Sequence, residues 1–194
     1  MYILFEGIDG VGKSTQIELL SAKYQNPIIT KEPGGTEFGV HVREILLGGK
    51  FKLSPRAEAL MFLADRAEHY AKVVAPNANK IVISDRGFIS GIAYALANEN
   101  SYDAKILLEF NKFALNSNLP DKVVFFEADK ELLEQRLLSR GGSDAVEARG
   151  FEYLLLVQQN MKNLLLDLNL NTLYIDASKS VQEISKEIEE FIQF

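Results

Sequence analysis

The sequence predicts an α/β fold of the doubly wound kind, a five-stranded parallel sheet flanked by helices. Short runs rich in β-branched and aromatic residues recur along the chain, and longer stretches with helical periodicity separate them. Strands joined through helices form right-handed crossovers, and therefore a mostly parallel sheet that is covered on both faces. The five runs are YILF at 2–5, PIIT at 27–30, KIVIS at 80–84, KVVFF at 122–126 and TLYID at 172–176.

Helical stretches fill the intervals between these strands. Residues 17–24 follow the first strand with helical spacing of apolar side chains, and residues 132–137 do so after the fourth strand. Ser54 followed by Pro55 indicates a helix start, because serine caps a helix and proline fits its first turn. We expect this helix to reach about Val74. Its expected core-facing stripe is Leu60, Ala64, Ala67 and Ala71.

A second face of the same helix has mixed chemistry. Phe62, Arg66 and His69 recur at the i, i+4 and i+7 positions. A face that combines an aromatic ring, a guanidinium and an imidazole is unusual for a side that is purely buried or purely solvated. We therefore interpret it as part of a site.

The chain is expected to form one domain over residues 1–194. It has no repeat of 20–50 residues and no linker rich in proline, glycine or serine that would divide it. One segment differs from its surroundings, SRGGSDAVEARG at 139–150, which is polar and carries glycines between two helical stretches. We interpret it as a mobile lid.

Composition narrows the class of protein. The net charge of −6 argues against a nucleic-acid coat and against a polybasic membrane surface. The apolar runs are far shorter than the roughly 20 residues that span a bilayer, and no signal peptide is legible. The chain has no cysteine, so its fold does not depend on disulfides. A cytoplasmic setting fits these features.

A phosphate-binding motif follows the first strand. GIDGVGKST at 7–15 satisfies G-x-x-x-x-G-K-[ST] in the required place between a strand and a helix. Its backbone N–H groups and the helix N-terminus bind phosphate, Lys13 reaches the β- and γ-phosphates, and Ser14 can ligate Mg²⁺. The alternative is a glycine turn with an incidental lysine. The predicted ATP-binding residues are Gly7, Ile8, Asp9, Gly10, Val11, Gly12, Lys13, Ser14 and Thr15.

A charged pair follows the third strand. Open α/β sheets place ligands at the carboxyl ends of their strands, where Asp85 and Arg86 stand. We assign Asp85 to the magnesium ion through water, together with Ser14, and Arg86 to a phosphoryl group. A structural ion pair is the alternative.

The chemistry follows from what accompanies the motif. A guanine-reading N-K-x-D is missing, because NKIV at 79–82 and NKFA at 111–114 lack the aspartate. A kinase of a small phosphorylated acceptor needs several arginines and a lid that excludes water. Arg43, Arg86 and the arginines of the 139–150 segment supply this set. Phosphoryl transfer to a small molecule fits better than a regulatory switch.

Four segments together resemble the thymidylate kinase family, over nearly the whole chain. They are FEGIDGVGKST at 5–15, KEPGGTEFGVHVREILL at 31–47, LMFLADRAEHY at 60–70 and SDRGFISGIAYA at 84–95. The resemblance implies transfer of the ATP γ-phosphate to dTMP, with Mg²⁺, on the path to dTTP. A kinase for another nucleotide or deoxynucleoside, and a nucleotide-binding switch with little chemistry, remain the alternatives.

The resemblance also implies roles for the acceptor side. Asp9 contacts the sugar hydroxyl and helps to position the phosphate, or else holds the loop by a hydrogen bond. Arg43 grips the acceptor phosphate, with a solvated helix residue as the alternative. Pro33 lines the base pocket after a tight turn, for which a cis peptide bond is one option. Phe62 stacks on thymine, unless it is a core phenylalanine.

Further family roles fall on two helices. Arg66 donates to the thymine O4 and thereby rejects cytosine, or else forms a surface ion pair. Tyr94 fills the space of a ribose 2′-hydroxyl, and Ser90 belongs to the same acceptor set. His41 and His69 have no partners that indicate a nucleophile, so no covalent intermediate is expected.

The sequence departs from the family in three places. Gly91 and Ala95 stand where many members carry polar side chains near the base. The third place is the lid: members whose motif has no arginine, as here at Gly10 and Val11, usually carry a lid arginine after an aspartate, but Asp144 is followed by Ala145. Arg149 or Arg140 is then expected to supply the lid charge, with Arg149 preferred, and Glu147 to orient the acceptor.

The family is usually a homodimer. Apolar helical faces at 60–74 and 101–117 are candidates for the interface, although core packing explains them equally well. The predicted catalytic set is Lys13, Asp9, Arg86, Arg149 and Arg140.

Overall fold

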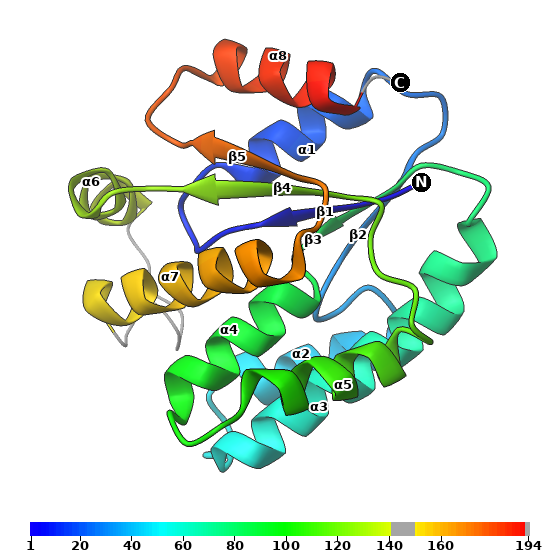
Figure 1. Cartoon of the computed structure of the whole chain (residues 1–194), viewed down its shortest axis with the longest axis vertical. Helices are drawn as coiled ribbons and strands as arrows, with labels where there is room; N and C mark the ends of the chain where they lie inside the picture. The colour runs from blue at the N-terminus through cyan, green and yellow to red at the C-terminus, as the bar shows by residue number, and fades with distance from the viewer. Residues whose placement is uncertain (141–149, 193–194) are drawn as a thin grey trace.

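A computed structural model describes residues 1–140 and 150–192, and of residues 137–140 the backbone alone. The described chain forms a five-stranded sheet in the order β2-β3-β1-β4-β5, and every pairing is parallel (Figure 1). The strands are β1 (Tyr2–Glu6), β2 (Ile28–Lys31), β3 (Val82–Asp85), β4 (Lys122–Glu127) and β5 (Thr172–Asp176). The five predicted strands and the doubly wound class are confirmed.

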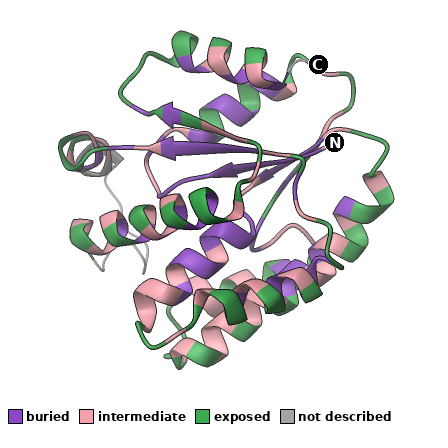
Figure 2. Cartoon of the chain, in the orientation of Figure 1, coloured by how far each residue is buried: buried purple, intermediate pink, exposed green. Residues whose placement is uncertain are grey.

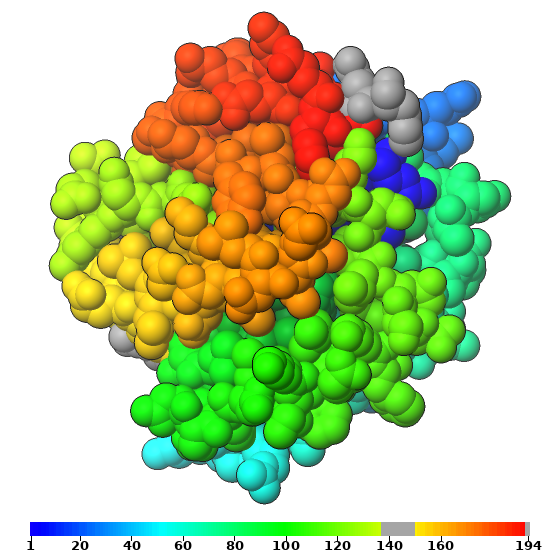
Figure 3. Space-filling model, viewed as in Figure 1, coloured from blue at the N-terminus to red at the C-terminus, as the bar shows by residue number. Residues whose placement is uncertain are grey.

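Helices cover both faces of this sheet. α1 (Lys13–Ser21) and α8 (Val181–Ile192) lie on one face, and α4 (Phe88–Asn98) and α7 (Phe151–Leu168) on the other (Figure 1). α4 and α7 pack along each other, as the green and orange segments of Figure 3 show. α2 (Glu37–Leu47), α3 (Pro55–His69) and α5 (Ala104–Ala114) form an outer group below α4, and α6 (Lys130–Arg140) follows β4.

The core lies between the sheet and these helices. The central strands are buried on both sides, while the helices are buried on their inner faces and exposed outward (Figure 2). Phe5, Ile83 and Phe125 have no exposed surface. Continuous apolar runs are therefore required in the strands, because a parallel sheet is covered on both faces.

Helix α3 starts where the sequence predicts, but the face that it buries is not the predicted one. Ser54 accepts a hydrogen bond from the backbone N–H of Ala57, as expected of a cap. A π-helical segment, Tyr70–Val74, continues the helix to the predicted end. The expected core stripe of Leu60, Ala64, Ala67 and Ala71 is wrong, because Leu60 is 55% exposed and Ala64 and Ala71 are also exposed.

The inward face of α3 is the polar one. Arg66 and His69 are buried, and Phe62 is partly buried beside them. Burial of these polar groups is tolerated because each has a partner, as described below. Residues 141–149, which make up most of the predicted lid, lie outside the described part of the chain.

The sheet register sets the position of the site. The N–H of Arg86 donates to the carbonyl of Phe5, and the N–H of Glu32 donates to the carbonyl of Asp85. The ends of β1, β2 and β3 are thereby aligned. Parallel strands end on one edge, and there the loops after these three strands meet.

Candidate active site

The loop between β1 and α1 has the geometry of a phosphate-binding loop. Gly7, Gly10 and Gly12 all have positive φ, from 84° to 142°. A Cβ atom on Gly7 would lie 2.9 Å from the carbonyl oxygen of Phe126. Glycine is therefore required at this position by both its backbone angle and its neighbour. Helix α1 begins at Lys13, so its free N–H groups face the loop.

Lys13 is buried within this loop. Its Nζ donates to the carbonyls of Gly7 and Ile8, each at 3.0 Å, and lies 4.0 Å from Oδ1 of Asp85. Burial and the nearby Arg86 lower the pKa of Lys13 to about 8, although Asp85 opposes the shift. The ammonium is thus held at the centre of the loop.

Arg86 connects the end of β3 to the same loop. Its Nη1 donates to the carbonyl of Gly7 at 2.7 Å and to Oγ of Ser90 at 3.1 Å, and its Nη2 donates to Oδ1 of Asp9 at 2.8 Å. Burial disfavours its charge, yet Tyr94 and Asp9 raise the pKa of Arg86. Its φ of 71° is unusual for a residue other than glycine and is typical of functional sites.

The buried carboxylate of Glu6 supports Arg86 through Ser90. Glu6 has no exposed surface, and its two oxygens accept from the N–H and the hydroxyl of Ser90 at 3.3 and 2.5 Å. The Ser90 hydroxyl donates to Glu6 and accepts from Arg86, which fixes its orientation. Burial raises the pKa of Glu6, and Ser90 opposes the shift. Glu6 had no predicted role in the site, because the residue stands inside a strand.

A cavity between α3 and α4, the α3/α4 cavity, opens beside the loop. Every acceptor-side residue predicted within the described chain lines it. Glu32, Leu46, Leu47, Glu58, Gly87 and Gly91 complete the wall, of which only Gly91 drew attention in the sequence. The full lining is Asp9, Glu32, Pro33, Arg43, Leu46, Leu47, Glu58, Phe62, Arg66, Arg86, Gly87, Ser90, Gly91 and Tyr94.

The turn after β2 shapes one side of this cavity. The bond between Glu32 and Pro33 is cis. Nη1 of Arg43, on α2, donates to the carbonyl of Pro33 at 3.0 Å. On the opposite side the Tyr94 ring lies 5.6 Å from the Arg86 guanidinium. Two guanidinium groups and an aromatic ring therefore border the same space.

A buried polar network holds Arg66 in the wall of the cavity. Its Nε donates to Oε2 of Glu32 at 2.8 Å, Nη1 to Oδ1 of Asn111 at 2.7 Å, and Nη2 to the carbonyl of Gly87 at 2.9 Å. The other oxygen of Glu32 contacts Nδ1 of His69 at 2.8 Å. Although burial opposes ionisation, Arg66 and His69 hold the pKa of Glu32 below its usual range.

This network corrects one alternative drawn from the sequence. Arg66 forms a buried ion pair, not a surface one, and it still borders the cavity. Nε2 of His69 also contacts Oγ1 of Thr30 at 2.7 Å, so both ring nitrogens of His69 have a partner. Asn111, on α5, carried no local signal that could have revealed its contact with Arg66.

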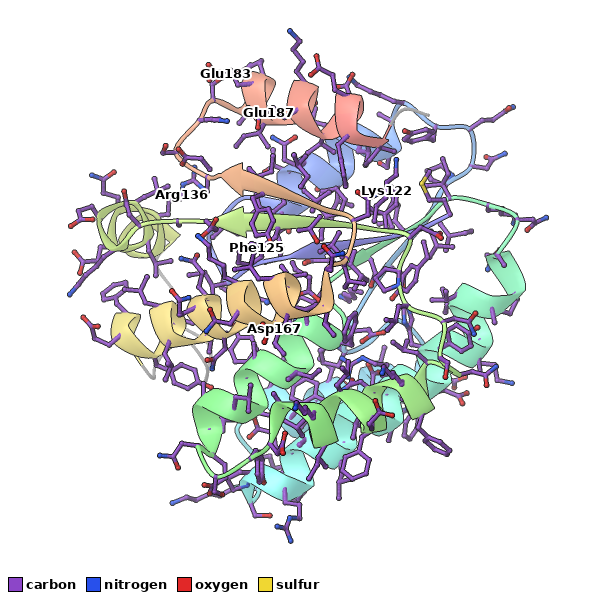
Figure 4. All side chains as sticks on the ribbon, viewed as in Figure 1. Lys122, Phe125, Arg136, Asp167, Glu183 and Glu187 are labelled. Atoms are coloured by element: carbon purple, nitrogen blue, oxygen red, sulfur yellow. The ribbon has the colours of Figure 1, made fainter. Side chains whose placement is uncertain are left out.

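A second cavity, the Arg136 cavity, lies on the other side of the loop. It measures about 260 Å³, and Arg136 lines it, with Nη1 donating to the carbonyl of Gly10 and Nη2 to that of Ala177. Figure 4 shows Arg136 between α6 and β5, at the carboxyl edge of the sheet. Arg136 had no predicted role in the site. The cavity is lined by Gly10, Val11, Gly12, Thr15, Gln16, Arg136, Lys179, Val181 and Ile184.

The predicted magnesium residues suit a divalent cation. Oδ1 of Asp85 is buried without a hydrogen-bond donor, and the Ser14 side chain stands exposed at the start of α1. A hard oxygen ligand of this kind is what Mg²⁺ prefers. Of the lid residues, Arg149 and Glu147 lie outside the described residues, and Arg140 is described only as the last residue of α6.

Fold and site together define a class. A glycine-rich loop with a buried lysine lies between two cavities at the carboxyl edge of a parallel sheet, which is the arrangement of a P-loop nucleoside monophosphate kinase. Among the described residues, no helix is long and apolar enough to cross a membrane. A profile of the thymidylate kinase family matches residues 5–188, and the chain belongs to this family.

Individual relatives agree with this assignment. The chain is 63% identical to a thymidylate kinase of Campylobacter concisus and 57% identical to one of Campylobacter curvus, with both chains covered completely. A solved thymidylate kinase structure from Candida albicans superposes with a TM-score of 0.79 at 28% identity, covering 98% of this chain and 90% of that one. The family and the fold expected from the sequence are confirmed, and with them an ATP-dependent phosphotransferase.

Proposed function

We propose that this chain transfers the γ-phosphate of ATP to dTMP, giving dTDP and ADP. The observation that supports this most directly is that two cavities share one phosphate-binding loop. Asp9 faces the α3/α4 cavity, and the next residue, Gly10, faces the Arg136 cavity. Two phosphate chains that enter from opposite sides therefore meet over Lys13 and Arg86.

In this proposal ATP occupies the Arg136 cavity and the loop 7–15. The loop N–H groups and the N-terminus of α1 bind the β- and γ-phosphates, and Lys13 exchanges its contacts with Gly7 and Ile8 for phosphate oxygens. Arg136 lies where the nucleoside part of ATP enters. Its planar guanidinium can stack on the purine ring.

We assign the magnesium ion to Ser14 and Asp85. The Ser14 hydroxyl would bind it directly and Asp85 through water. The ion, when bound, neutralises charge on the β- and γ-phosphate oxygens. The protein's own contribution beside it is the ammonium of Lys13, held 4.0 Å from Asp85.

We place dTMP in the α3/α4 cavity. Arg43 and Arg86 bind its phosphate, and Asp9 holds Arg86 in place while facing the sugar. Phe62 supplies the ring that stacks on the base. Tyr94, packed against Arg86, occupies the position expected to exclude a 2′-hydroxyl.

The rest of the acceptor pocket fixes the base and the arginine. Pro33 closes the side at β2, and Arg66 faces the base with two N–H groups that no described residue accepts from. Ser90 keeps Arg86 directed at the loop. Transfer is direct and in line, so the chain's task is to position the reactants and neutralise charge.

The lid residues complete the proposal. Arg149, or else Arg140, supplies positive charge to the transferring group, and Glu147 orients the acceptor. An alanine variant tests each of these residues. For the arginine that acts on the transferring group, the variant should lower kcat more than it lowers the affinity for dTMP. A cytoplasmic location stays a prediction.

We also propose that the enzyme is a homodimer joined through α3 and α5. Leu60, Ile106 and Phe110 are each about half exposed there, and Phe113 is 89% exposed. Phe113→Asp should convert a dimer to a monomer in sedimentation velocity experiments. Leu166→Asp, at a 61% exposed position on α7, is the matched control and should not.

The function is tested by comparing dTMP, dUMP, dCMP and thymidine as acceptors in a coupled ADP-release assay. Preferential turnover of dTMP supports the proposal. Turnover of another acceptor alone would assign the chain to a different substrate, and no turnover would favour a nucleotide-binding switch.

A further inference from the structure

We propose that Asn111 of α5 is a positioning residue for the acceptor base, acting through Arg66. It contacts Arg66 at 2.7 Å from a helix that does not itself line the α3/α4 cavity. The inference rests on the proposed function, because it takes Arg66 to face the dTMP base. It adds a determinant of acceptor recognition outside the pocket wall.

The orientation of the Asn111 amide is fixed by its second contact. Nδ2 donates at 2.7 Å to the carbonyl of Leu107, one turn earlier on α5. A carbonyl can only accept, so this end of the amide must be the NH₂ group. Oδ1 is thereby directed at Arg66. Asn111 is only 3% exposed, so water does not compete for either contact.

The guanidinium has little room to settle elsewhere. Arg66 has five N–H groups, and Glu32, Asn111 and the Gly87 carbonyl accept from three of them. A Cβ atom at Gly91 would lie 2.9 Å from both Nη1 and Nη2, so the group lies directly against the α4 backbone. Its plane is set by three acceptors from three separate segments.

Each acceptor has a distinct part in this arrangement. Glu32 balances the charge of Arg66 and is shared with His69. Asn111 is neutral and gives direction without further charge. Loss of Asn111 should therefore leave Arg66 buried and held by Glu32 and the Gly87 carbonyl, with Nη1 no longer held by an acceptor. The N–H groups that we take to face the base would then be less well fixed in direction.

Two variants of Asn111 separate this role from a packing role. Asn111→Asp keeps an oxygen for Arg66 and loses the donor to Leu107. Asn111→Thr can donate to the Leu107 carbonyl, as threonine does in helices, but is too short to reach Arg66. Glu109→Thr, on the exposed side of α5, controls for the β-branched side chain in the helix.

The readout is the KM of each substrate for each variant. Asn111→Thr should raise the KM for dTMP about tenfold, as expected for one hydrogen bond to a charged group, with the KM for ATP unchanged. It should also narrow the preference for dTMP over dCMP. Asn111→Asp should keep the KM for dTMP within about threefold of wild type, because the oxygen for Arg66 remains. Glu109→Thr should match wild type.

Two outcomes overturn the inference. An unchanged KM for dTMP in Asn111→Thr would do so. An equal rise in both Asn111 variants would also do so, because Asn111→Asp keeps the oxygen for Arg66 and the effect would then belong to the packing of α5. The wild-type protein tests the proposed function separately. If it does not use dTMP, both fall; if it does and Asn111→Thr behaves as wild type, only this inference falls.

Discussion

The buried pair of Glu32 and Arg66 offers a test of what holds the acceptor side together. Glu32→Gln keeps the shape of the side chain and removes its charge. The glutamine oxygen can still accept from Nε of Arg66, and its NH₂ group can face Nδ1 of His69 if the imidazole carries its proton on Nε2, toward Thr30. Hydrogen bonds are largely kept, so the loss is mainly that of the charge partner.

The expected cost is large because both partners are buried. Their side chains are each 2% exposed and lie 2.8 Å apart. Removing one member of such a pair costs about 3–5 kcal/mol, against a typical total stability of about 5–15 kcal/mol. With a urea m-value of about 2 kcal/mol/M, the unfolding midpoint should fall by about 2 M. Glu109→Gln, the same change on the surface, should stay within about 0.5 kcal/mol of wild type.

The pH dependence has a defined sign. The pKa of Glu32 is lowered in the folded protein, so its contribution is full above the unfolded value of about 4.3. It is lost as the pH falls through the lower, folded pKa. The gap between wild type and Glu32→Gln should therefore be widest near neutral pH and narrow below about pH 4. A gap of less than about 1 kcal/mol at pH 7, or one that stays constant in acid, would refute the reasoning.

Three further predictions concern the phosphate-binding loop. Gly7→Ala should abolish ATP binding in calorimetry while the far-ultraviolet circular dichroism is retained, because its Cβ would meet the Phe126 carbonyl at 2.9 Å; normal binding would contradict this. The pKa of Lys13 is about 8, so ATP affinity should weaken as the pH rises from 8 to 9. Lys13→Arg should flatten this pH dependence of ATP affinity. A wild-type ATP affinity that does not change between pH 8 and 9 would contradict the prediction. Arg136→Ala should raise the KM for ATP and leave the KM for dTMP unchanged; the reverse pattern would place Arg136 on the acceptor side.

The sequence predicted what depends on local pattern. The strands are continuous apolar runs, and the loop at 7–15 carries its chemistry in nine consecutive residues. Ser54 and Pro55 marked a helix start that the structure confirms. In these cases the interactions that decide the structure involve residues close together in the chain.

What the sequence missed depends on distant partners. The acceptors of Arg136 lie 126 and 41 residues away, and Asn111 is 45 residues from Arg66. The error on α3 has the same origin. Apolar periodicity assumes that a helix turns its apolar side inward. In α3 the polar side is the buried one, because Arg66 on that side pairs with Glu32 at the end of β2. Only knowledge of Glu32 as a partner would have reversed the prediction.

Three neighbouring strands, β1, β2 and β3, each carry a carboxylate at or next to their carboxyl end, and this explains how an acidic chain can bind polyanions. β1 and β3 end in Glu6 and Asp85, and Glu32 directly follows β2. Each carboxylate holds one cation. Glu6 supports Arg86 by way of Ser90, Asp85 lies beside Lys13, and Glu32 pairs directly with Arg66. The cations therefore hold their positions before any substrate arrives. Groups fixed in this way need little reorganisation when charge develops between two phosphates, and that is the main contribution a protein can make to phosphoryl transfer.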